Sequence, residues 1–269
     1  MSTRLLKSVY FLPVGSFTLN HFGFGVNTFF SLVFVAYFAG LISSIAGSGG
    51  ILTLSALLWA GLPPLNALAT NKVQSSLGTL SSAWNFFRKG HLDIEPLRLS
   101  VAMAIAGSVI GTLVVQSLNA ELLTRLIPFL LLAIALYFLL SPKINDSDHP
   151  ERISQRLFAC TAALGMGFYG GFFGPGMGSI MPFLFVWLLG HNLVKATAET
   201  KLMILAVNGT SALIFVFSGY VVWSLAIAMS VAQVFGARMG SNLVMKRGSG
   251  FVQPIITGVT LLMAIKLLW

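Results

Sequence analysis

Two lysines lie next to polar residues in a chain that is otherwise strongly apolar. Lys72 follows Ala-Thr-Asn and Lys201 follows Ala-Glu-Thr, and a shift of 129 residues superposes one on the other. An ammonium group at membrane depth can balance the charge of a bound anion. Alternatively, each lysine extends to the membrane surface and anchors a helix end. The sequence leaves both interpretations open, and the repeated spacing favours the anion.

Two glycine clusters precede short apolar segments. Residues 47–50 read Gly-Ser-Gly-Gly and residues 174–178 read Gly-Pro-Gly-Met-Gly. Each following segment has only about ten residues, half of what a bilayer core requires. Such a segment is typical of a half-helix that starts near mid-membrane, where its free N–H groups and its positive dipole end favour an anion. Packing of small residues against a neighbouring helix is the alternative explanation of the glycines.

Further polar side chains lie near these features, at positions where amides and hydroxyls either bind substrate or bond across helices. The full set of predicted substrate-binding residues is Gly47, Ser48, Gly49, Gly50, Asn71, Lys72, Gln74, Gly174, Gly176, Gly178, Ser179, Thr200, Lys201 and Asn208. Glu199 is the one acid beside this set and is a candidate proton carrier. An ion pair with Lys195 or Lys201 would explain it equally well.

The composition decides the class of protein that surrounds these residues. Of 269 residues, 56% are hydrophobic and only 9% are charged, which cannot cover a soluble surface and predicts an integral membrane protein. The net charge of +9 comes from bases scattered between apolar stretches, so we expect lipid and no nucleic acid as partner. The histidines lack metal-ligand spacing and no hydrolase or phosphate-loop motif is present, so no metal, cofactor or enzymatic activity is predicted.

Ten apolar segments fall into two series separated by a polar linker. We predict an N-terminal flank at 1–27, a first transmembrane repeat at 28–140, a linker at 141–156 and a second repeat at 157–269. The segments are 28–46, 50–60, 73–87, 97–118, 122–140, 157–173, 177–189, 202–217, 222–245 and 251–269. The expected fold is therefore an all-α membrane protein with 8–10 transmembrane segments.

Pairs of glycines support an internal duplication. A shift of 129 pairs Gly107 with Gly236 and Gly111 with Gly240, and upstream a shift of 127 pairs Gly40 with Gly167. Because each unit has an odd number of elements, the second unit is expected to be inverted relative to the first. The paired glycines outside the two clusters are interpreted as helix-packing positions.

Charge asymmetry predicts the orientation. With ten alternating segments, one side receives Arg88, Lys89, Arg98, Lys143, Arg152, Arg156, Lys195, Lys201, Arg238, Lys246 and Arg247, and the other receives Arg4, Lys7, Lys72, Arg125 and Lys266. The richer side is the cytoplasmic one by the positive-inside rule. Both termini are then expected to be periplasmic.

Several of these motifs resemble one known family. Gly-Ser-Gly-Gly at 47–50, Gly-Leu-Pro-Pro-Leu-Asn-Ala-Leu-Ala-Thr-Asn-Lys at 61–72 and Arg-Lys-Gly-His-Leu-Asp at 88–93 resemble the first half of a TauE/SafE-type protein. Ala-Glu-Thr-Lys at 198–201, Asn-Gly at 208–209, Ser-Gly-Tyr at 218–220 and Gly-Ala-Arg-Met-Gly at 236–240 resemble its second half. Family members usually have more glycine in the first loop, and here Met177 interrupts the glycines of the second.

The resemblance implies a secondary transporter of the bacterial inner membrane that exports a small sulfur-containing anion such as sulfite, a sulfonate or sulfoacetate. Alternating access between two repeats is the expected mechanism. A passive anion channel, a carrier for a different small anion and a membrane-embedded partner subunit are the alternatives. The sequence leaves homo-oligomerisation open.

Overall fold

The structure is a computed structural model that describes residues 25–47, 49–140 and 150–247. The described residues are helical, without strands, which confirms the all-α prediction. The helices of the first half are α1 (Val26–Ala46), α2 (Gly49–Trp59), α3 (Pro64–Arg88), α4 (Arg98–Ser117) and α5 (Ala120–Leu140), with the short η2 (Glu95–Leu97) before α4. The second half contains α6 (Gln155–Phe158), the π-helical turn η3 (Ala159–Ala163), α7 (Leu164–Phe172), α8 (Met177–Leu189), α9 (Leu193–Phe217) and α10 (Trp223–Arg247). The predicted segment 251–269 lies outside the described residues.

Glycines in the left-handed backbone region bound the two short helices, as the sequence predicts. Gly47 ends α1 with φ 76° and Gly61 follows α2 with φ 92°. Gly176 precedes α8 with φ 86° and Gly190 ends it with φ 70°. A side chain at these positions would strain the backbone, so glycine breaks each helix there. The resulting α2 and α8 have only 11 and 13 residues.

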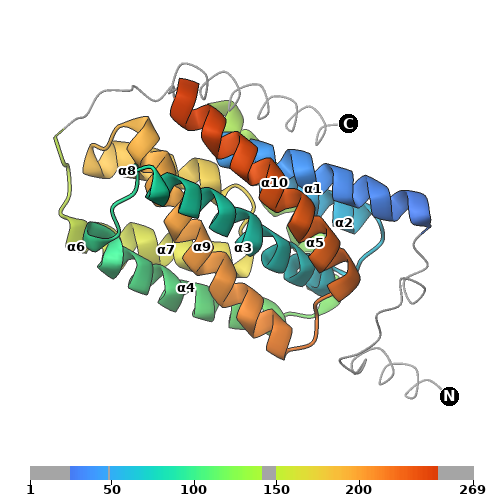
Figure 1. Ribbon diagram of the computed structural model, residues 1–269. Helices are drawn as coiled ribbons and strands as arrows, with labels where there is room; N and C mark the ends of the chain where they lie inside the picture. Colours follow the sequence, from blue (N-terminus) through green and yellow to red (C-terminus); the bar gives the residue numbers. More distant parts are fainter. Residues whose placement is uncertain (1–24, 48, 141–149, 248–269) are drawn as a thin grey trace.

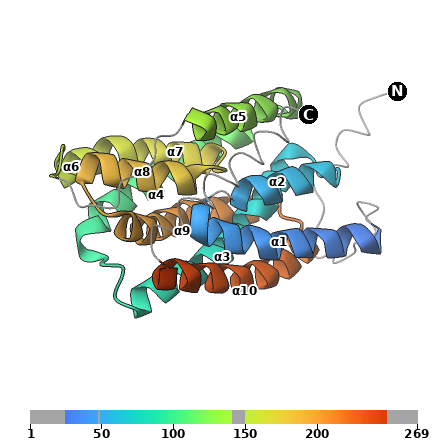
Figure 2. The ribbon, with the colours of Figure 1, turned by 90° about the horizontal axis from the view of Figure 1, so that it is seen from above.

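The first helix of each half packs on the fourth helix of the other half. Helix α1 lies along α10, and α7 lies along α4 (Figure 1). The third helices, α3 and α9, pack against each other at the centre. In Figure 2, α2 and α8 run in opposite directions away from the middle of the molecule. This packing follows the element order of the predicted duplication, while the inversion of the halves stays a prediction.

The outer surface is apolar, as a lipid-facing surface must be. Exposed large side chains on α1 and α3 include Phe30, Phe34, Leu80 and Trp84. Three described helices are long and apolar enough to cross a membrane by themselves, spanning Val26–Ile45, Glu95–Ser117 and Leu193–Phe217. Helices α3 and α10 have 25 residues each and carry more polar side chains.

The third helix of each half starts earlier than the apolar pattern predicts. The predicted segments began at residues 73 and 202, but α3 begins at Pro64 and α9 at Leu193. The polar residues directly before each apolar run, from Thr70 to Lys72 and from Thr197 to Lys201, are helical and buried. Lys72 and Lys201 are therefore inside long helices, and the predicted starts at residues 73 and 202 are wrong.

The predicted packing glycines lie at close backbone contacts between the two halves. A Cβ on Gly107 would lie 2.6 Å from the backbone N of Phe168, and one on Gly236 would lie 3.0 Å from that of Leu41. Gly40, Gly111 and Gly240 approach the facing helix in the same way. This geometry confirms their packing role.

A pair of glycines on α7 gives a matched test of this packing. In Gly167→Ala the new Cβ would lie 2.7 Å from Ala104 Cα, whereas at Gly165 it would meet nothing within 4 Å. We expect Gly167→Ala to cost about 1–3 kcal/mol and to lower the thermal midpoint in detergent by roughly 3–10 °C. Gly165→Ala should leave the midpoint unchanged or raise it, since alanine favours helix. Equal midpoints for the two variants would contradict the close α4–α7 contact.

Candidate functional site

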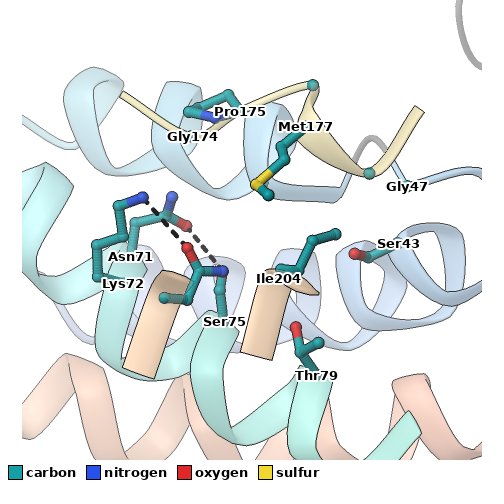
Figure 3. A pocket seen from close by; sticks show the side chains of 14 residues that line it. Ser43, Gly47, Asn71, Lys72, Ser75, Thr79, Gly174, Pro175, Met177 and Ile204 are labelled. Carbon is teal, nitrogen blue, oxygen red and sulfur yellow. Dashed lines mark hydrogen bonds between the residues drawn. The ribbon is translucent and has the colours of Figure 1, made fainter. Parts of the chain in front are cut away.

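A small cavity lies where the broken elements meet. Its volume is about 30 Å³, which is room for about two or three water-sized groups. Of the predicted site residues, those that border it are Gly47, Gly50, Asn71, Lys72, Gly174, Gly176, Gly178 and Asn208. In Figure 3, Asn71 and Lys72 extend from α3 toward the loop that contains Gly174 and Pro175. We call this space the central cavity.

Lys72 provides the cationic group of the central cavity. Its side chain is buried, and its Nζ donates hydrogen bonds to the Gly170 carbonyl and to Asn208 Oδ1, the second at 3.2 Å. The Gly170 carbonyl belongs to the last turn of α7, where helix carbonyls lack intrahelical partners and the dipole is negative. The ammonium group therefore connects α3 of the first half to the end of α7 of the second.

Lys201 makes the corresponding bond in the opposite direction. Its Nζ donates to the carbonyl of Ser43 in the last turn of α1, so it connects α9 of the second half to α1 of the first. Ser43 and Gly170 are equivalent under the upstream shift of 127 residues, just as the lysines are under the shift of 129. Lys72 borders the central cavity and Lys201 does not.

Burial excludes the interpretation that these lysines reach the membrane surface. Lys72 is 1% exposed and Lys201 is 2% exposed. In the part of the chain that the structure describes, neither ammonium group forms an ion pair with a carboxylate. A buried cation without an acidic partner is costly, and a bound anion would relieve that cost.

Asn71 is held in one orientation by its neighbours. Its Oδ1 accepts hydrogen bonds from Thr53 Oγ1 at 2.6 Å, Gln74 Nε2 at 2.9 Å and Ser75 Oγ at 3.4 Å. With the oxygen occupied on that side, the amide nitrogen is the group that remains for a ligand. Asn71 and Lys72 together can offer two donors to an anion.

The two glycine turns touch each other next to the cavity. A Cβ on Gly178 would lie 2.6 Å from Gly47 Cα, and a Cβ on Gly47 would lie 2.6 Å from Gly178 Cα. The N-terminal end of α8 and the turn before α2 therefore meet backbone to backbone. Only glycine at both positions permits this approach.

Several predicted residues are near the cavity without bordering it. Gly49 packs on α1, where its Cβ would lie 2.6 Å from Ser43 Cβ. Gln74, Thr200 and Ser179 are buried outside the lining, and within the described ranges Gln74 Oε1 and Thr200 Oγ1 have no hydrogen-bond partner. Ser48 lies outside the described residues. The binding role of the whole predicted set stays a prediction.

Glu199 is paired with a histidine that the sequence gave no reason to select. Its Oε2 lies 2.6 Å from His191 Nδ1, and its Oε1 lies 4.0 Å from Lys195 Nζ. Both Glu199 and His191 are buried, and the ring of Phe185 stacks on the imidazole. The pair joins the end of α8 to the start of α9, outside the cavity lining.

Residues outside the predicted set also line the cavity. They are Ser43, Ser75, Thr79, Pro175, Met177 and Ile204. Ser75 and Thr79 follow Asn71 on α3 at intervals of four residues, so helical periodicity along α3 could have identified them. Ser43 and Ile204 come from α1 and α9 and reach the cavity only through tertiary packing. Among the described residues, no group of three or more His, Cys, Asp or Glu side chains is arranged to hold a metal ion.

The helices, their broken centre and a polar cavity at that centre are typical of a multi-pass membrane transporter. Residues 32–267 match the family model described as "Sulfite exporter TauE/SafE". The chain belongs to the TauE/SafE family.

Curated relatives agree with this assignment. The chain is 44% identical over 238 residues, 88% of each chain, to "Probable membrane transporter protein YfcA" of Escherichia coli strain K12. It is 38% identical to a "Probable membrane transporter protein" of Haemophilus influenzae, over 91% of this chain and 96% of the relative. Bacillus subtilis YdhB, also named a probable membrane transporter, is 24% identical over 86% of this chain and 99% of its own length. No solved structure matches the chain.

Proposed function

We propose that the protein is a secondary transporter that moves a small sulfur-containing anion across the bacterial inner membrane, in the direction of export. The observation that supports this most is a buried lysine at a cavity between two broken helices, which forms no ion pair with a carboxylate of the described residues. Lys72 Nζ and the Asn71 amide would donate to the anion's oxygens, and the start of α8 would add its positive dipole end.

The anion would replace a helix end as the partner of Lys72. In the resting geometry the ammonium group binds the Gly170 carbonyl, so an incoming oxyanion competes with that carbonyl for the same hydrogens. Loss of this bond would release α7 from α3 and allow one repeat to rock against the other. The bond from Lys201 to the Ser43 carbonyl would be broken and formed in the same way in the other half, because these residues occupy the repeat-equivalent positions. Both termini would face the periplasm.

Saturation and substrate competition test the proposal. Proteoliposomes are loaded with buffer and given labelled sulfite over a wide concentration range, and flux is measured with and without excess sulfoacetate or methanesulfonate. A carrier for small sulfur anions gives saturable flux that the competing anions reduce. Flux that rises linearly with sulfite and currents from single molecules would indicate a passive channel and contradict the proposal.

We propose further that the His191–Glu199 pair couples transport to protons. In Glu199→Gln, sulfite exchange under equal pH on both sides should stay within about twofold of wild type, because Glu199 does not border the cavity. Accumulation driven by a pH gradient should be lost, because the carboxylate can no longer exchange a proton. Lys195→Gln, which removes only the exposed partner, is the control. Intact gradient-driven accumulation by Glu199→Gln would rule out coupling through this carboxylate.

A further inference from the structure

Polar side chains extend from the central cavity along one face of α3. Asn71, Ser75 and Thr79 border the cavity, and the same face continues with Ser82 and Asn85 to Lys89, the residue that directly follows the end of α3. Successive members are three or four residues apart, about one helical turn each, so they form one row. From Asn71 to Lys89 the row spans about 27 Å at 1.5 Å per residue. We call these six residues the polar row of α3.

The opposite face of α3 is apolar and exposed. Leu77, Leu80, Trp84 and Phe87 are between 44% and 52% exposed and would contact lipid. Ser82 and Asn85 are 1% and 3% exposed. The helix is therefore amphipathic within the membrane, with its polar face turned toward the protein interior.

The polar row faces α10, where a second set of polar groups lies. Asn85 Nδ2 donates to Ser241 Oγ at 2.7 Å and to Asn242 Oδ1 at 3.0 Å. Lys89 Nζ donates to the same Asn242 Oδ1 at 2.9 Å. Helices α3 and α10 pack on each other (Figure 1). The end of the row that is remote from the cavity is thus polar and positively charged.

Two buried acceptors beside the row have no donor among the residues that the structure describes. Gln233 of α10 is 2% exposed and its amide lies against Gly78 of α3, yet its Oε1 has no hydrogen-bond partner. Gln74 Oε1 on α3 is also buried and unpartnered. An unsatisfied carbonyl oxygen at membrane depth costs free energy, and water or a polar ligand ordinarily satisfies such a group. If the row served only to pack α3 on α10, we would expect each buried polar group to have a hydrogen-bond partner on the facing helix.

The equivalent face of α9 is interrupted. Under the shift of 129 residues, Ser75 corresponds to Ile204 and Asn85 to Ile214, while Gln233 corresponds to Ala104. Packing between repeats does not require a continuous polar row, because α9 packs on α4 without one. An uninterrupted polar row is therefore found in the first half alone, although Thr200, Asn208, Ser211 and Ser218 keep four of the six equivalent positions polar.

We propose that the polar row of α3 lines an aqueous route between the central cavity and the Lys89 end, along which the anion passes. This inference rests on the proposed function for the identity of the anion. Hydroxyls and amides replace part of the anion's hydration along the route, and the positive end attracts it electrostatically. Ser82 and Asn85 thereby become residues of the permeation route.

Cysteine labelling tests the route. In a Cys160→Ser background, which removes the chain's single cysteine, Ser82→Cys, Asn85→Cys and the lipid-facing control Leu80→Cys are made one at a time. The probe is the anionic, water-borne reagent sulfonatoethyl methanethiosulfonate, added to sealed vesicles of each orientation. Because the thiolate form reacts and requires water, we expect the Ser82 and Asn85 variants to react at least about 10-fold faster than the Leu80 variant. Methanesulfonate, which does not react with the reagent, should slow them.

The labelling results test the route, and a separate flux measurement tests the transport activity. If Ser82→Cys and Asn85→Cys react as slowly as Leu80→Cys, the route is wrong. Fast labelling that methanesulfonate does not slow would contradict passage of the anion. Sulfite flux by the unlabelled wild type, measured in the same vesicles, judges the proposed function independently. Ser82→Cys is nearly isosteric, so it keeps the route testable even if Asn85→Cys fails to fold.

Discussion

Replacing Lys72 with Met is expected to lower sulfite flux by about 10- to 100-fold, which corresponds to the loss of one charge-assisted hydrogen bond. Methionine fills nearly the same volume, so the cavity keeps its shape while the donor to the anion and to Gly170 is removed. The apparent KM for sulfite should rise, because the lost contact is present in the bound state. Initial rates in proteoliposomes over a range of sulfite concentrations measure both quantities.

Lys201→Met is the informative comparison for Lys72→Met. Lys201 makes the equivalent bond to Ser43 but does not border the central cavity. We therefore expect Lys201→Met to lower the maximal rate with a smaller change in KM. The substitution should affect the exchange between the two alternating-access conformations more than it affects sulfite binding at the central cavity. Lys195→Met, on an exposed side chain, should behave like wild type. Identical KM values for Lys72→Met and wild type would exclude Lys72 as the anion's partner.

The second large effect is expected for Gly178→Ala. The added methyl group would lie 2.6 Å from Gly47 Cα and 2.9 Å from Gly47 C, and this neighbour is backbone held at φ 76° that cannot rotate away. Separating the two turns should cost about 1–3 kcal/mol and displace the start of α8 from the cavity. We expect flux to fall more than about 10-fold, because hydrogen-bond donors at a displaced start of α8 would bind the anion more weakly.

Gly209→Ala gives the matched control for Gly178→Ala. It places the same methyl group on α9, where nothing lies within 4 Å. Elution as a single species in detergent and the thermal midpoint distinguish a displaced site from an unfolded protein. Wild-type flux in Gly178→Ala would show that the contact between the turns is unimportant for transport.

Much of the architecture could be predicted because helix breaks depend on local chemistry. The glycine-rich turns predicted two short helices, and Gly47, Gly61, Gly176 and Gly190 bound these helices in the left-handed conformation. The packing glycines were predictable from their repeated spacing. In contrast, the starts of α3 and α9 were missed, because polar residues that are buried in protein look like loop residues in an apolar sequence.

The details of the site depended on contacts between distant segments. The sequence paired Lys72 with Lys201 but could not reveal that each donates to a helix end of the opposite half. Nor could it show that only Lys72 borders the cavity, since the repeat treats the two alike. His191 was missed as the partner of Glu199 because its approach depends on the turn at Gly190.

Counterflow of labelled sulfite tests the central claim most directly. Proteoliposomes preloaded with unlabelled sulfite are diluted into labelled sulfite, and wild type is compared with Lys72→Met at equal protein content. A carrier that binds sulfite at Lys72 predicts transient accumulation of label by wild type and at most about one-tenth of that rate by Lys72→Met. Equal label uptake with and without preloaded sulfite, or an unimpaired Lys72→Met, would contradict it.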